Sequence, residues 1–152
     1  GQLGQAQIAA LARILDRLGN EGVTRIVLIH HPPLTGQAPW SRALRDSAEL
    51  EGVLAEHGAE LVLHGHNHCD GYTEFAWRCG RIPIVGIASG SAGRIHKHEP
   101  LGRYNLLSIA LAENGARIEC ITRGLDPTGT FMHQIHRKVF SAHAPAASSG
   151  AG

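Results

Sequence analysis

The sequence predicts a mixed α/β fold in which an α-β-α-β unit is followed by a β-meander. The chain has 152 residues, of which 43% are hydrophobic and 18% are charged, so one globular domain with a sizeable core is expected. Apolar residues recur at helical spacing in residues 5–18, and short runs of apolar residues follow at 23–29 and 60–64. Further strand patterns occupy residues 73–122.

The first helix–strand pair is well delimited. Apolar residues recur every three or four positions up to Leu18, and Gly19-Asn20 ends the helix. Residues 23–29 are nearly continuously apolar and rich in β-branched side chains, which is typical of a strand covered on both faces. The strand ends at residues 30–33, His-His-Pro-Pro, because proline has no N–H to continue the pairing.

The second helix–strand pair begins at Asp46. Glu49 stands three residues later, so the two residues are expected to form a capping box, and His57-Gly58 ends the helix. The strand at 60–64 leads into Gly-His-Asn-His at 65–68. A pair of parallel apolar strands needs neighbours at both edges, so we expect the sheet to continue in residues outside this sequence.

The pattern after the second helix–strand pair predicts further strands and a C-terminal tail. Asn114-Gly115 is a hairpin signal, and residues 131–140 are compatible with a short helix or a strand. We expect one domain over residues 1–125, followed by an extension over 126–152 whose end, rich in Ala, Ser, Gly and Pro, is disordered. The candidate strands of the meander lie at residues 73–77, 82–87, 104–111 and 116–122.

Composition excludes several classes of function. The net charge is +1 and there are 7 aromatic residues, so no nucleic-acid-binding surface is evident. No apolar run approaches the ~20 residues of a membrane span, and no signal peptide is visible, so a cytoplasmic location is expected. The three cysteines suggest neither a disulfide framework nor a metal knuckle, and idle thiols are expected.

Histidine is the unusual residue, with 11 copies. His30 follows the first strand, and His66 and His68 follow the second, where functional side chains gather in α/β sheets. On an extended backbone His66 and His68 would project to the same side and suit one metal ion or two. The alternative is that these histidines only end the strands as polar side chains. His64 either orients a neighbour or fills the core.

Two motifs carry a resemblance. Val-Leu-Ile-His-His-Pro-Pro at 27–33 and Leu-Val-Leu-His-Gly-His-Asn-His at 61–68 resemble the last two motifs of the calcineurin-like metallophosphoesterases. The similarity extends over residues 1–123 and includes bacterial members of the cyclic-nucleotide phosphodiesterase type. It implies the C-terminal part of a metallophosphoesterase α/β sandwich. It also implies a phosphomonoesterase or phosphodiesterase activity on a small-molecule phosphoester, through a hydroxide activated by two metal ions.

The resemblance assigns roles to single residues. His30 and His66 would bind one metal ion and His68 the other, with Mn, Fe or Zn as candidates. His31 and Asn67 would contact the substrate or support the ligands. His96, in a His-Lys-His sequence, is a candidate substrate contact.

The chain also departs from the family pattern. The Asp-x-His, Gly-Asp and Gly-Asn-His motifs, which supply carboxylate and amide ligands, are absent. We therefore expect a fragment that is inactive by itself. The other readings are a catalytically inactive metal-binding or interaction module, and an α/β scaffold with incidental histidines. An unpaired sheet edge would favour self-association.

Overall fold

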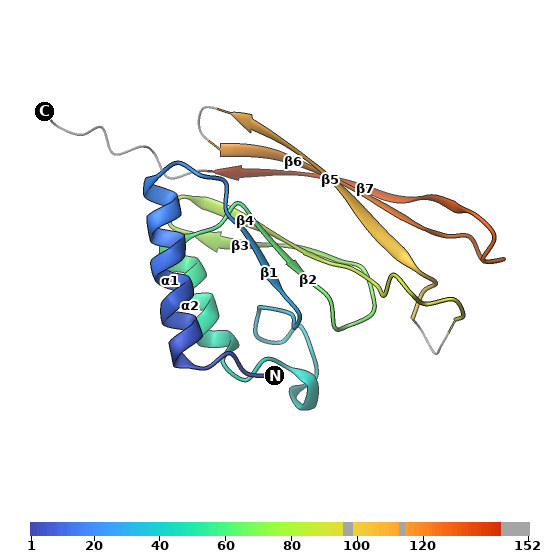
Figure 1. Cartoon of the computed structure of the whole chain (residues 1–152), viewed down its shortest axis with the longest axis horizontal. Helices are drawn as coiled ribbons and strands as arrows, with labels where there is room; N and C mark the ends of the chain where they lie inside the picture. The colour runs from blue at the N-terminus through green and yellow to red at the C-terminus, as the bar shows by residue number, and fades with distance from the viewer. Residues whose placement is uncertain (96–98, 113–114, 144–152) are drawn as a thin grey trace, which may run out of the picture.

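The computed structural model describes residues 1–95, 99–112 and 115–143 (Figure 1). A short 3-10 helix spans Trp40–Arg42, after the first strand and before the second helix. The described residues form helices α1 (Gln5–Asn20) and α2 (Ser47–His57) and strands β1 (Ile26–Ile29), β2 (Leu61–His64), β3 (Gly71–Trp77), β4 (Gly80–Gly86), β5 (Arg103–Ala112), β6 (Gly115–Leu125) and β7 (Met132–His143).

The strands form two sheets, which confirms the α/β class. The first sheet has the order β1-β2-β4-β3, with β1, β2 and β4 parallel and β3 antiparallel to β4. The second is an antiparallel meander in the order β5-β6-β7. All four strands predicted at 73–122 form, but β3 and β4 belong to the first sheet, and only β5 and β6 belong to the meander. The ambiguous segment 131–140 is a strand, since β7 pairs with β6 from Gly115 to Leu125. Asn114 of the hairpin signal and the tail at 144–152 lie outside the described residues.

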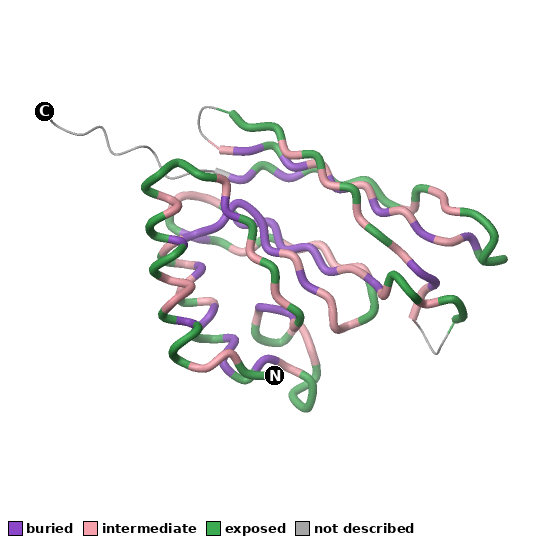
Figure 2. The backbone as a smooth tube through the Cα atoms, in the orientation of Figure 1, coloured by how far each residue is buried: buried purple, intermediate pink, exposed green. Residues whose placement is uncertain are grey.

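Three layers bury two apolar cores. The helices cover one face of the first sheet, and the second sheet covers part of the other face (Figure 1). Leu50 and Leu54 of α2 pack with Val62 and Ile84 on the helix side. On the far side β2 and β4 pack against the inner residues of β6 and β7. Figure 2 shows the buried backbone concentrated in β2 and β4, between the two covering layers. The second core comprises Leu61, Val85, Ala116, Ile118, Cys120, Phe140 and Ala142.

The expectation that the first strand is covered on both faces is wrong for this chain. β1 is an edge strand, and its residues alternate between exposed and half-buried. Ile26 is 43% exposed and Leu28 is 76% exposed. The second sheet does not reach over β1, because its strand β7 packs against β4, two strands further along. An apolar strip therefore remains uncovered in the described part of the chain.

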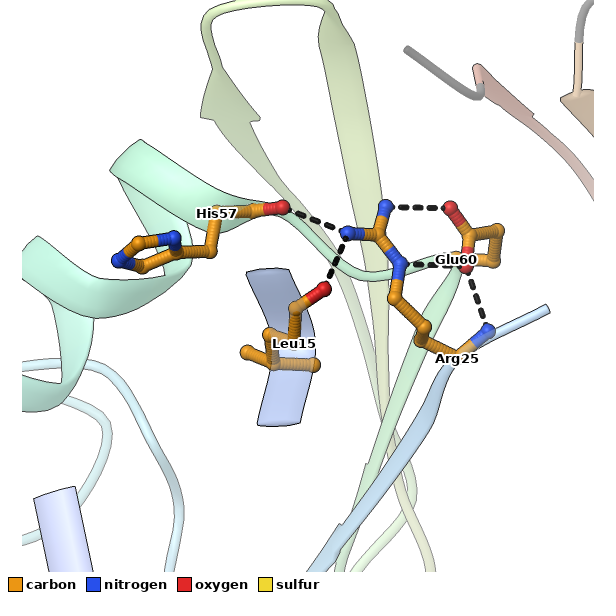
Figure 3. A network of polar contacts seen from close by, with 4 residues as sticks. All are labelled: Leu15, Arg25, His57 and Glu60. Carbon is orange, nitrogen blue, oxygen red and sulfur yellow. Dashed lines mark hydrogen bonds and ion pairs between the residues drawn. The ribbon is translucent and has the colours of Figure 1, made fainter. Parts of the chain in front are cut away.

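A buried ion pair joins the first helix, the second helix and the sheet (Figure 3). Arg25 and Glu60, just before β1 and β2, are 3% and 4% exposed. The Arg25 guanidinium donates to both carboxylate oxygens of Glu60, from Nη2 at 2.7 Å and from Nε at 3.1 Å. Its Nη1 donates to the backbone carbonyls of His57, at 2.7 Å, and Leu15, at 3.3 Å. One side chain thus fixes both helices to the start of the parallel strands.

The predicted capping box is also wrong, although helix α2 begins where the sequence indicates. The Asp46 side chain makes no capping hydrogen bond to α2. Its carboxylate instead accepts hydrogen bonds from the backbone N–H groups of Leu3 and Gly4, at 3.0 and 2.7 Å from Oδ2, just before α1. Burial opposes ionisation, but these hydrogen bonds outweigh it and lower the pKa of Asp46. Asp46 thus fixes the approach to the first helix.

Candidate metal centre

The candidate histidines follow β1 and β2, which are neighbouring parallel strands. Ile29 at the end of β1 is in register with His64 at the end of β2. The backbone N–H of Gly65 donates to the carbonyl oxygen of His30 at 3.1 Å, so the pairing continues one step beyond the strands. The two histidine segments are therefore brought together at the carboxyl edge of the sheet, as the sequence predicts.

Three imidazole rings gather at this edge. The ring centroids of His30 and His66 are 5.0 Å apart, and those of His31 and His66 are 4.2 Å apart. His66 Nδ1 lies 3.1 Å from His30 Nε2. Two nitrogens that share a tetrahedral zinc ion at 2.0–2.1 Å are separated by about 3.4 Å. A small displacement of either ring would place both nitrogens at ligand distance from one ion.

The environment of His66 favours the neutral ring that a metal ion requires. Burial and the nearby His30 lower the pKa of His66, and the backbone of Arg42 offsets this only in part. Burial also lowers the pKa of His31, as do the neighbouring rings of His66 and His30. His66 Nε2 is buried and makes no hydrogen bond of normal geometry within the described residues. The donor set at His30 and His66 is thus chemically suited to a cation such as zinc.

The motif backbone differs from the expected extended conformation. His66 has φ 67° and His68 has φ 52°, so both occupy the left-handed region. This conformation costs a non-glycine residue roughly 1–2 kcal/mol, because Cβ approaches the following carbonyl oxygen. The prediction that the motif is extended, with both rings on one side, is therefore wrong. The chain turns sharply through these residues instead of continuing β2.

His68 lies apart from the other rings. Its Nδ1 is 3.0 Å from Oε2 of Glu99, and its side chain is half exposed. In the part of the chain that the structure describes, no three His, Cys, Asp or Glu side chains form a group that could hold a metal ion. His30 and His66 are thus brought together, and His68 is not part of their cluster. His96 lies outside the described residues.

Asn67 and His64 make contacts within the protein. Asn67 Nδ2 donates to the carbonyl oxygen of Gln37 at 2.8 Å. His64 is buried, and a Cβ on Gly86 would lie 2.7 Å from its ring, so this ring packs directly on the β4 backbone. His64 thus fills the core. Beside it lies an open hollow of about 340 Å³, lined by Leu28, Ile29, His30, Leu63, His64, Gly65 and Ile87.

Asp70, two residues after His68, is a polar anchor that the sequence did not indicate. Asp70 forms an ion pair with Nη1 of Arg103, at the start of β5, and lies 3.7 Å from His136 Nε2 on β7. The Asp70 side chain is only 7% exposed. These contacts tie the loop that carries His66 and His68 to the second sheet. No periodicity or motif spacing signals this pairing, because its members are 33 and 66 residues apart.

Replacing Asp70 with asparagine should destabilise the chain by about 1–3 kcal/mol, because Arg103 loses its charged partner in a mostly buried position. Denaturant-induced unfolding measures this change. Asp16→Asn is the matched control, since Asp16 is 61% exposed on α1 and should change stability by less than about 0.5 kcal/mol. Equal stabilities of the Asp70 variant and the unmodified chain would contradict the anchoring role.

A scan against protein-family models finds no match, and a search of curated proteins finds no significant match. Among the described residues, no helix is both long and apolar enough to cross a membrane. The three cysteines are free thiols.

Proposed function

We propose that this chain carries the histidine half of a binuclear metallophosphoesterase site, with His30 and His66 as ligands of one metal ion and His68 as a ligand of the second. The observation that carries the proposal is the 3.1 Å separation of His30 Nε2 and His66 Nδ1. Two imidazole nitrogens this close together are a good partial donor set for a divalent ion.

We assign His68 to a second metal ion because it follows His66 by two residues in the Gly-His-Asn-His motif. His66 and His68 belong to the same turn, yet one ring joins the His30 cluster and the other contacts Glu99. Sites that bind two ions 3.5–4 Å apart need ligands that approach from different sides. Because His66 and His68 both have left-handed backbone, the chain turns sharply between them, and their rings can approach from different sides.

The side chains have distinct proposed roles. His30, His66 and His68 supply neutral nitrogen ligands, and the hydrogen bond from Asn67 to Gln37 holds the motif turn against the preceding loop. His31 packs on His66 and would contact the substrate or restrain the ligand ring. Bound metal ions would activate water for attack on a phosphoester and neutralise charge on its oxygens.

The uncovered edge of the first sheet supports an incomplete domain. Among the described residues β1 has no second neighbouring strand, and Leu28 is exposed beside the hollow that adjoins His30. Additional parallel strands would pair with the open edge of β1. Their carboxyl ends would reach the same edge as His30, where carboxylate ligands are needed. We therefore propose that the missing acidic ligands belong to a segment that adds to β1.

The coding sequence upstream of Gly1 provides the test. We expect it to encode Asp-x-His, Gly-Asp and Gly-Asn-His motifs in frame. The extended protein should hydrolyse bis(4-nitrophenyl) phosphate with Mn²⁺, whereas the 152-residue chain should show no metal-dependent turnover. A His66→Ala version of the extended protein should be inactive. Metal-dependent turnover by the short chain, or full activity of the His66 variant, would contradict the proposal.

A metal-binding or interaction module without catalysis is the second candidate. It is favoured by the absence of a three-ligand group among the described residues. In this case zinc would still bind at His30 and His66, but the extended protein would not hydrolyse phosphodiesters. The combination of zinc binding with no turnover separates the two functions.

A further inference from the structure

We propose that Glu99 is the positioning residue of His68: its carboxylate holds the imidazole proton on Nδ1 and leaves Nε2 free to bind a cation. This inference rests on the proposed function, because His68 is there a metal ligand. Glu99 Oε2 lies 3.0 Å from His68 Nδ1 across 31 residues of sequence. The contact joins the motif turn to the segment that leads into β5.

The hydrogen-bond chemistry determines which ring nitrogen carries the proton. An ionised carboxylate can only accept a hydrogen bond, so Nδ1 of His68 must donate to Glu99. A neutral imidazole has one N–H group, and its lone pair is then on Nε2. Metal-bound histidines commonly donate their second N–H to a carboxylate, which orients the ring and makes it a stronger ligand. Glu99 occupies this position relative to His68.

His68 needs such a restraint more than the other candidate ligands do. His30 and His66 contact each other and pack against His31, whereas the side chain of His68 is 50% exposed. The carboxylate of Glu99 is the ring partner that the structure gives to His68. Without it, the ring would be free to change rotamer or tautomer in solvent.

The backbone that follows Glu99 is held by hydrogen bonds at residues 102 and 103. Leu101 is 8% exposed, and the Gly102 N–H donates to the Ala92 carbonyl oxygen at 2.7 Å. The N–H of Arg103 donates to the Ser89 carbonyl oxygen at 3.3 Å. These contacts fix the segment two to four residues after Glu99. They hold the start of β5 against the loop that contains Ser89 and Ala92.

Nitrogen-15 NMR of the histidine rings tests the inference on the metal-free chain at about pH 8, where unperturbed imidazoles are neutral. We expect His68 to carry its proton on Nδ1. In Glu99→Ala the proton should move predominantly to Nε2, whereas Glu99→Gln, whose amide oxygen still accepts a hydrogen bond, should retain it on Nδ1. Glu74→Ala, at an exposed position on β3, is the matched control and should change nothing. A proton on Nε2 in the unmodified chain, or no response to Glu99→Ala, would overturn the inference.

A zinc titration followed at the same resonances separates this inference from the proposed function. Glu99→Ala should weaken the apparent zinc affinity measured at His68 Nε2 by about 10-fold, the lower end of the effect of removing such a carboxylate. The responses of His30 and His66 should stay unchanged. An equal zinc affinity of His68 in both proteins would overturn the role of Glu99. A lack of any zinc response at His30 and His66 would contradict the proposed metal centre instead, whatever the tautomer of His68.

Discussion

Replacing Arg25 with alanine is expected to lower the free energy of unfolding by about 3–5 kcal/mol, because Glu60 would remain as an unpaired charge in the core. The carbonyl groups of His57 and Leu15 would lose their donor at the same time. Domains are commonly stable by only about 5–15 kcal/mol, so the variant should unfold at a much lower denaturant concentration. Urea unfolding followed by circular dichroism measures the change.

Two further substitutions make this test specific. Arg25→Lys keeps the positive charge but not the two parallel hydrogen bonds, so an intermediate loss is expected. Arg17→Ala removes an exposed arginine of α1 that lies 4.0 Å from Glu21, and its effect should stay below about 0.5 kcal/mol. If Arg25→Ala were no more destabilising than Arg17→Ala, the pair would not hold the helices to the sheet.

Replacing His66 with alanine is expected to weaken zinc binding at the His30–His66 position by more than about 100-fold. Loss of a residue that only supports a ligand already costs 10–100-fold in affinity, and His66 is a proposed ligand. His66 is only partly buried, so the fold should lose little stability. Isothermal titration calorimetry with Zn²⁺ gives the affinity, and thermal unfolding verifies the fold.

His57→Ala is the control for adventitious zinc binding by histidine. His57 ends α2, and its carbonyl oxygen contacts Arg25 before β1, whereas His30 follows β1. The two histidines therefore lie at opposite ends of the strand. Zinc affinity should be unchanged in this variant. Equal losses in the His57 and His66 variants, or none in either, would contradict a specific centre.

The fold could be predicted from the sequence where local pattern determines structure. Helical spacing in α1, the apolar runs of β1 and β2, and the strand patterns of β3 to β6 are all properties of neighbouring residues. The meeting of His30 and His66 could also be predicted, because parallel strands joined by one helix bring their carboxyl ends to one edge.

Long-range pairing of side chains could not be predicted in this way. Asp46 stands at a position typical of a helix cap, but backbone donors 42 and 43 residues away bind its carboxylate. Nothing near Arg25 in sequence indicates that Glu60 is its partner, and Glu99 has no signal that points to His68. Such pairs depend on how the layers stack, which no local periodicity encodes.

The exposed face of β1 has a related explanation. A continuous apolar run indicates that a strand is suited to burial on both faces. It does not indicate which segment of the chain covers that strand. Leu28 is 76% exposed because the meander packs over β4 and not over β1. The left-handed backbone of His66 and His68 could not be predicted either, since glycine is the residue that commonly adopts this conformation.

The central claim is that His30 and His66 bind one metal ion, and anomalous diffraction from crystals grown with Zn²⁺ tests it most directly. If these two histidines share a metal ion, a zinc peak is expected about 2.0–2.1 Å from both His30 Nε2 and His66 Nδ1. A zinc-containing crystal whose peaks lie only at other histidines, with the 3.1 Å contact between these two rings unchanged, would contradict it.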